Sequence, residues 1–201
     1  MNEQEDFWKG EFGDKYISRN NDKKILASNI SFFSKVLKNC KNIKSVLEFG
    51  PNIGLNLKAL NNLYPEMKLA GVEINKNAFE ILSKNNFIEA FNNSIESFEI
   101  KGKYDLTLTK GVLIHINPKQ LSVVYEKLYS ASNKYILIAE YYSDHPEEIL
   151  YRGFKNKLFK RDFAGEFLKQ FKNVKLKDYG FIYKGDKSFL SDSINWFLLE
   201  K

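Results

Sequence analysis

Short apolar runs alternate with longer helix-like segments along most of this chain. Five runs have the length and composition of buried strands: Ser45–Phe49, Leu69–Glu73, Phe87–Phe91, Tyr104–Thr109 and Tyr135–Ala139. Between them, helical patterns occupy Leu55–Leu63, Lys76–Lys84 and Pro118–Ala131. Parallel neighbours in a sheet need a crossover connection of about this length, so the alternation predicts an α/β fold with a parallel sheet.

The segments at the two ends of this series complete the fold prediction. Lys23–Asn39 and Asp162–Phe171 have apolar residues at helical spacing. Two strand-like runs then follow one another, Val174–Tyr183 and Ser193–Leu199, with a turn at Lys184-Gly185-Asp186. Consecutive strands without a helix between them form an antiparallel hairpin. We therefore expect a Rossmann-like, seven-stranded, mostly parallel sheet with a C-terminal antiparallel hairpin and helices on both faces.

The chain is 201 residues long and 43% hydrophobic, which suits a single α/β domain. We expect residues 22–201 to form its core and residues 1–21 an N-terminal arm or lid. Cys40 is the sole cysteine, so no disulfide can form within the chain. The N-terminus lacks a signal-peptide pattern, and no apolar run approaches the roughly 20 residues of a membrane span. These features predict a cytoplasmic protein with no membrane partner.

The net charge of +6 raises the question of an anionic partner. The lysines are scattered along the chain instead of gathered in one stripe, which argues against nucleic acid. The charge also fits attraction of a small anionic substrate such as a nucleotide-linked sugar. No Cys/His cluster has the spacing of metal ligands, so we expect no metal site.

The segment after the first strand has the composition of a ligand-binding loop. Gly50 follows the strand directly and Gly54 opens the next helix, so the backbone can approach a ligand closely. A dinucleotide fingerprint would read Gly-x-Gly-x-x-Gly, whereas Gly50 and Gly54 are separated by three residues. Glu48 would repel a pyrophosphate but could accept a hydrogen bond from an ammonium group.

This loop resembles motif I of class I S-adenosylmethionine-dependent methyltransferases, and the end of the second strand resembles motif II. An acid at the end of strand two, Glu73, can bind both ribose hydroxyls of an adenosine. The pair Glu48 and Glu73 favours S-adenosylmethionine as cofactor over a dinucleotide. The expected cofactor-binding residues are Glu48, Gly50, Pro51, Asn52, Gly54, Glu73, Ile74, Asn93, Ser94, Lys110 and Gly111.

The chemistry is expected after strands four and five. His115 could act as general base, since its pKa lies near neutral pH, or could only line the pocket. Glu140 and Tyr141 end strand five and are further catalytic candidates. The Asn/Asp-Pro-Pro-Tyr/Phe motif of nucleic-acid amino methyltransferases is absent, as is a Pro-Cys nucleophile. These absences argue against nucleobase methylation.

Aromatic and basic residues near the start of the chain and after strand five are candidates for binding an acidic acceptor. Arginine can bind a carboxylate or phosphate with two hydrogen bonds. The alternative is a helix N-terminus capped by Asp162 with solvated basic neighbours. The N-terminal aromatics form either a lid over the cofactor or an ordinary edge helix. The expected acceptor-binding residues are Tyr16, Arg19, Tyr142, Tyr151, Arg152, Lys160 and Arg161.

Several longer segments resemble a small bacterial group, the pseudaminic acid biosynthesis-associated methylases. They are Phe7–Tyr16, Lys110–Pro118, Ile138–Tyr142, Tyr151–Gly153, Lys160–Gly165, Asp178–Phe181 and Asn195–Leu199. The resemblance implies an enzyme of surface-glycan biosynthesis that methylates a sugar or sugar nucleotide on oxygen or nitrogen. Two alternatives stay open: a methyltransferase for a protein lysine or small amine, and a cofactor-binding scaffold without turnover.

Overall fold

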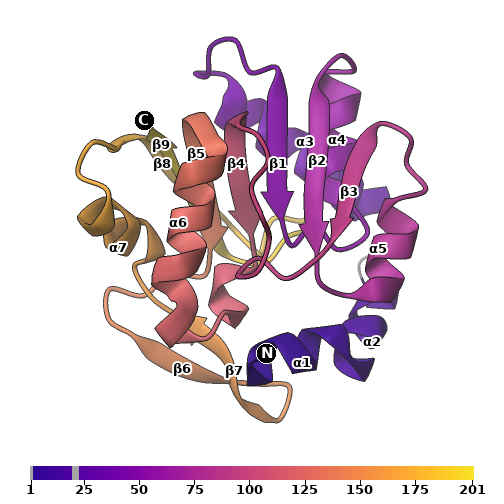
Figure 1. Cartoon of the computed structure of the whole chain (residues 1–201), viewed down its shortest axis with the longest axis vertical. Helices are drawn as coiled ribbons and strands as arrows, with labels where there is room; N and C mark the ends of the chain where they lie inside the picture. The colour runs from indigo at the N-terminus through magenta and orange to yellow at the C-terminus, as the bar shows by residue number, and fades with distance from the viewer. Residues whose placement is uncertain (1, 20–22) are drawn as a thin grey trace.

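A computed structural model of the chain describes residues 2–19 and 23–201. Its centre is a seven-stranded sheet in the order β3-β2-β1-β4-β5-β9-β8 (Figure 1). The first five strands in the chain pair in parallel, while β9 is antiparallel to both β5 and β8. The strands are β1 (Ser45–Phe49), β2 (Lys68–Glu73), β3 (Ile88–Asn92), β4 (Tyr104–Lys110), β5 (Ser132–Glu140), β8 (Lys175–Ile182) and β9 (Ile194–Glu200).

Helices cover both faces of the sheet and bury two separate apolar cores. On one face α3 (Lys23–Leu37), α4 (Leu55–Leu63) and α5 (Lys76–Leu82) pack; on the other, α6 (Leu121–Ala131) and α7 (Phe163–Gln170). Strand β1 shows how the alternating side chains of a strand serve both cores. Val46 packs with α3 and α4, whereas Leu47 and Phe49 pack on the side of α6 and α7. This architecture confirms the expected fold.

The expected helix at Pro118–Ala131 begins with a separate turn of 3₁₀-helix, Pro118–Gln120, before α6. The Asn117 side chain caps this turn by accepting a hydrogen bond from the Lys119 N–H at 3.0 Å. Asp162 caps α7 in the same manner, accepting from the Gly165 N–H at 2.8 Å. That cap agrees with the alternative expectation for Lys160 and Arg161, in which they are basic neighbours of a helix N-terminus capped by Asp162.

A second, two-stranded sheet was not expected from the sequence. Strands β6 (Glu147–Tyr151) and β7 (Phe154–Lys160) form an antiparallel hairpin between β5 and α7. Its two turn residues have positive φ, 50° at Arg152 and 89° at Gly153, as a type I′ turn requires. The sequence alone predicted only acceptor contacts for this segment, and that expectation was incomplete because most of the segment is a β-hairpin.

The N-terminal arm is helical. Asn2 forms a capping box with Glu5 at the start of α1 (Glu3–Lys9), and α2 (Glu11–Arg19) follows after Gly10. Figure 1 shows both helices at the edge of the sheet to which the strand arrowheads point. Residues 20 and 21, the end of the expected arm, lie outside the described residues. In the described part of the chain, no helix is long and apolar enough to cross a membrane.

Candidate functional site

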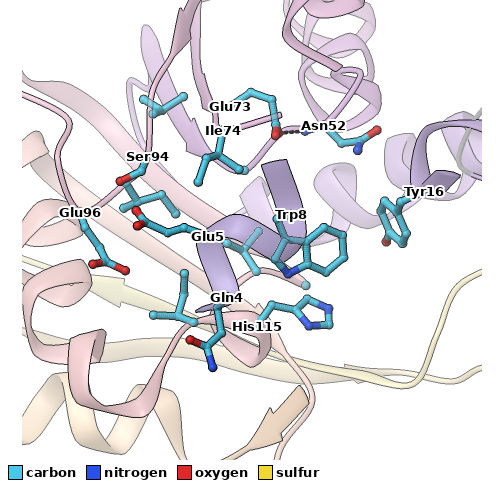
Figure 2. A pocket seen from close by; sticks show the side chains of 16 residues that line it. Gln4, Glu5, Trp8, Tyr16, Asn52, Glu73, Ile74, Ser94, Glu96 and His115 are labelled. Carbon is cyan, nitrogen blue, oxygen red and sulfur yellow. Dashed lines mark hydrogen bonds between the residues drawn. The ribbon is translucent and has the colours of Figure 1, made fainter. Parts of the chain in front are cut away.

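A cavity lies at the carboxyl edge of the sheet, beneath α1 and α2. It encloses about 740 Å³ of empty space, open solvent at its mouth included. Figure 2 shows side chains from the N-terminal helices facing those of the sheet edge across this space. Its lining residues are Gln4, Glu5, Trp8, Tyr16, Gly50, Asn52, Val72, Glu73, Ile74, Ser94, Ile95, Glu96, Gly111, Val112, His115 and Ile116.

The glycines of the loop after β1 are required by the backbone. Gly50 and Gly54 have φ of 73° and 82°, in the left-handed region. A Cβ on Gly50 would also lie 2.7 Å from Cγ2 of Val112, in the loop after β4. Gly50 and Asn52 line the cavity, whereas Pro51 and Gly54 shape the loop from outside it.

Glu73 connects the loop after β1 to the end of β2. Its Oε2 accepts a hydrogen bond from the Asn52 N–H at 2.7 Å (Figure 2), and its Oε1 accepts one from the Asn75 N–H at 2.8 Å. Burial raises the pKa of this carboxyl, and the backbone hydrogen bonds oppose that change. Glu73 and its neighbour Ile74 both line the cavity, at the position expected for a ribose.

Glu48 lies behind the cavity wall. Its Oε1 accepts a hydrogen bond from Asn56 Nδ2 at 2.6 Å, while its Oε2 is buried without a partner among the described residues. Burial raises the pKa of Glu48 to about 7. Lys110 at the end of β4 interacts electrostatically with Glu48, and burial lowers the pKa of this lysine. Gly111, the next residue, lines the cavity with φ of 70°.

The loop after β3 contributes Ser94 and Ile95 to the cavity wall. Asn93 does not line the cavity; its Oδ1 accepts a hydrogen bond from Ser97 Oγ at 2.7 Å. Glu96 lines it instead and accepts a hydrogen bond from Asn2 Nδ2 at 2.8 Å. The loop after β3 is thus tied to the start of α1.

His115 faces the cavity from the loop after β4. Its Nδ1 lies 2.6 Å from the main-chain oxygen of Lys157. Its ring packs on Trp8 at 4.6 Å between centroids (Figure 2) and on Tyr151 at 4.9 Å. A carbonyl oxygen only accepts, so Nδ1 carries the proton and Nε2 keeps a free lone pair. Burial lowers the pKa of His115 to about 4, which keeps the ring neutral at pH 7.

Glu140 is separated from the cavity by the loop that it supports. Its carboxylate accepts hydrogen bonds from the N–H groups of Val112 and Leu113, each at 3.1 Å, and of Ile114 at 3.4 Å. Burial raises its pKa to about 7. Tyr141, the next residue, lies near Asp192, and burial raises the pKa of its hydroxyl.

The expected acceptor-binding residues do not form one cluster. Tyr16 lines the cavity, and Tyr151 packs behind His115. Tyr142 and Lys160 line a separate groove at the end of β5.

The three arginines stand further away. Arg19 lies over the Phe12 ring at 5.4 Å, and Arg161 pairs with Glu166 at 2.8 Å. Arg152 lies in the hairpin turn, with its guanidinium 6.0 Å from the centroid of Tyr151. None of them lines the cavity.

Sequence reasoning missed several lining residues, among them Gln4, Glu5, Glu96 and Val112. A signal existed for Glu96, since it belongs to the same short loop as Ser94. No sequence signal marked Gln4 and Glu5, because their position on the cavity wall depends on how α1 packs. Among residues 2–19 and 23–201, no group of His, Cys, Asp or Glu could hold a metal ion.

Comparison with protein-family models gave no match, and neither did a search of curated proteins. Solved structures do match over nearly the whole chain. Magnesium protoporphyrin IX methyltransferase from Synechocystis, solved with bound S-adenosylhomocysteine, has 14% identity and a TM-score of 0.71, with 98% of this chain and 97% of that chain covered.

Two further solved structures match nearly the whole chain at similarly low sequence identity. An S-adenosylmethionine-dependent methyltransferase from Leishmania major has 16% identity and a TM-score of 0.74, covering 99% of this chain and 87% of that one. The 1,6-didemethyltoxoflavin N1-methyltransferase of Burkholderia thailandensis has 11% identity and a TM-score of 0.70, covering 98% and 86%. The chain therefore has the Rossmann-like fold of class I S-adenosylmethionine-dependent methyltransferases.

Proposed function

We propose that this chain is an S-adenosylmethionine-dependent methyltransferase that acts on a small-molecule acceptor. The observation that carries the proposal is the charge of the cavity at the carboxyl edge of β1 and β2. Three carboxylates line it, Glu5, Glu73 and Glu96, and among the residues that the structure describes no lysine or arginine does. S-adenosylmethionine carries a net positive charge, whereas the pyrophosphate of a dinucleotide would be repelled.

The residues on the wall fit the parts of this cofactor. Glu73 can accept hydrogen bonds from ribose hydroxyls, and Ile74, Ser94 and Ile95 offer apolar and polar contacts to an adenine. The Oε2 of Glu48 is buried behind the wall without a partner among the described residues, so the amino group of the methionine part reaches it only after a small rearrangement of the loop after β1. Lys110 ends β4, and Gly111 follows it on the cavity wall.

When bound, the cofactor supplies a methyl group activated by its sulfonium. The chain then needs to align the acceptor, exclude water and remove a proton where the acceptor is a hydroxyl. Neutral His115 presents Nε2 as the proton acceptor. Trp8 and Tyr16, on α1 and α2, cover the cavity and exclude water, so we propose that the N-terminal helices act as a lid.

The acceptor we favour is a sugar or sugar nucleotide, which the sequence resemblance supports. The net charge of +6 agrees with an anionic acceptor of this kind. An amine is the alternative acceptor, favoured by one observation: the carboxylates and the indole of Trp8 around the cavity would also attract a cation.

Isothermal titration calorimetry tests the cofactor. We expect S-adenosylhomocysteine to bind and NAD not to bind. Glu73→Gln should weaken the binding by about 1–3 kcal/mol, since it removes a buried charged acceptor. Glu80→Gln, at an exposed position on α5, serves as the matched control and should change nothing. Binding of NAD in preference to S-adenosylhomocysteine would overturn the proposal.

A further inference from the structure

A second concave site lies beside the cofactor cavity, at the end of β5. It is a groove between the ends of β5 and β7 and the β8–β9 hairpin, lined in part by Tyr141, Tyr142, Lys160, Phe181, Lys184 and Asp192. An isolated β-bridge between Tyr142 and Arg161 joins the first two of these elements. The groove is therefore built by three segments that are far apart in the sequence.

Tyr141 stands at the border between the groove and the cofactor cavity. It lines the groove, and it lies near enough to Tyr16 and Tyr151 to interact with them electrostatically. Tyr16 lines the cofactor cavity and Tyr151 packs against His115. A molecule held in the groove could extend past Tyr141 toward His115.

The two sites differ in charge. The cofactor cavity has three carboxylates on its wall, whereas the groove has two lysines and one aspartate. Lys184 pairs with Asp192 at 3.4 Å. Lys160 has no ion-pair partner in the described part of the chain, unlike its neighbour Arg161, which pairs with Glu166. The residues that line the groove thus carry one positive charge in excess, whereas the cavity wall is acidic, and this difference favours an anion in the groove over one in the cavity.

Two aromatic side chains line the groove with much of their surface exposed. Tyr142 is 42% and Phe181 50% exposed to solvent. Aromatic faces of this kind can stack on the apolar face of a ring. A ring-bearing molecule with one anionic group would thus contact both the aromatic residues and Lys160.

We propose that this groove is the acceptor subsite and that it binds the anionic end of a ring-bearing carboxylate or phosphate. This inference rests on the proposed methyltransferase function, because the groove becomes an acceptor site only beside a bound cofactor. It assigns a recognition role to the β8–β9 hairpin, which supplies Phe181, Lys184 and Asp192. Lys160 is its main cation.

The test uses the full chain saturated with S-adenosylhomocysteine, and ligand-observed NMR with three probes that share one ring. Glucuronate carries a carboxylate, glucose 1-phosphate a phosphate, and glucose neither. We expect one or both anions to bind more tightly than glucose, and the better anion identifies the group recognised. Lys160→Gln should weaken that binding about tenfold, the effect of losing one charge-assisted hydrogen bond.

Lys187→Gln is the matched control, since Lys187 is exposed on the same hairpin connection and does not line the groove. Any of three results would overturn the inference: equal binding of all three probes, no binding of either anion, or an equal loss of affinity in Lys160→Gln and Lys187→Gln. A failure of S-adenosylhomocysteine to bind in the first step would instead contradict the proposed function. The two failures are thereby distinguished.

Discussion

Nδ1 of His115 lies 2.6 Å from the main-chain oxygen of Lys157, so the β6–β7 hairpin fixes the tautomer of the histidine that faces the cavity. The Lys157 side chain in turn pairs with Glu3 on α1. One residue of the hairpin thus contacts both the candidate base and the proposed lid. The orientation of His115 and the position of α1 are coupled through it.

The buried state of His115 predicts a pH dependence of stability. Its native pKa of about 4 is below the ordinary 6.5, so the unfolded chain takes up the proton first as the pH falls. Stability should fall between pH 6.5 and pH 4, by up to ~3 kcal/mol from this group. His115→Asn retains a donor for Lys157 and does not titrate. Glu48 and Glu140 titrate in the same range with the opposite effect, but they do so in both proteins. In urea unfolding, the free energy of unfolding of the wild type should therefore fall relative to that of the variant between pH 6.5 and pH 4, and a constant difference would contradict the assignment.

Glu140 is predicted to act through the loop after β4. Glu140→Gln places an amide N–H₂ where the carboxylate accepts from main-chain N–H groups. The variant should lose about 1–3 kcal/mol of unfolding free energy and should bind S-adenosylhomocysteine more weakly. Glu99→Gln, at an exposed position, is the control. A variant with unchanged stability and affinity but reduced turnover would indicate direct catalysis instead.

Gly50, in the loop after β1, should not be replaceable without a loss of stability. Alanine there must adopt φ of 73° with its Cβ 2.7 Å from Val112. We expect a loss of about 1–3 kcal/mol in unfolding free energy. Gly102→Ala has no atom within 4 Å of the new Cβ and should have little effect. Thermal denaturation of both variants would decide; similar melting temperatures would argue against the close approach of the two loops.

Asn75 is predicted to hold the lid. Its Nδ2 donates to the Trp8 carbonyl at 3.1 Å and to Asp14 Oδ1 at 2.9 Å, while its Oδ1 caps α5. Asn75→Asp keeps the cap and places a carboxylate against both acceptors. Hydrogen exchange in residues 3–19 should then accelerate about tenfold, the effect of losing ~1.4 kcal/mol.

Asn86→Asp, a change at an exposed asparagine, provides the comparison for this experiment. Unchanged exchange in residues 3–19 of Asn75→Asp would show that the helices are held by their aromatic contacts alone. Exchange in α5 reports whether the cap persists.

The sheet could be predicted because strands such as Tyr135–Ala139 are apolar throughout and the strands are separated by helical patterns. The glycine loop and Glu73 also carried local signals, and Gly50, Asn52 and Glu73 line the cavity at the carboxyl edge of the sheet. The β6–β7 hairpin had a weaker signal, since its turn is Arg152-Gly153 and not the usual Asn-Gly. Arginine is rarely found at positive φ, so the turn was not recognised and β6 and β7 were not predicted.

Part of the site depends on tertiary contacts that no local pattern contains. Glu48 was expected at the cofactor, and its sequence position gives no sign that Asn56 would hold it behind the wall. Gln4 reaches the cavity because its amide nitrogen donates to the Asn156 oxygen, more than a hundred residues away in the chain. Such long-range pairs decide which of several polar residues face the ligand.

The carboxylates on the cavity wall have a consequence for turnover under the proposed reaction. Methyl transfer removes the sulfonium charge. S-adenosylhomocysteine therefore has one positive charge less than S-adenosylmethionine and is attracted less strongly by the carboxylates. Glu5 and Glu96, which line the cavity without belonging to either cofactor motif, act on this difference. The wall therefore favours exchange of product for substrate, and the charge that attracts the cofactor also limits inhibition by its product.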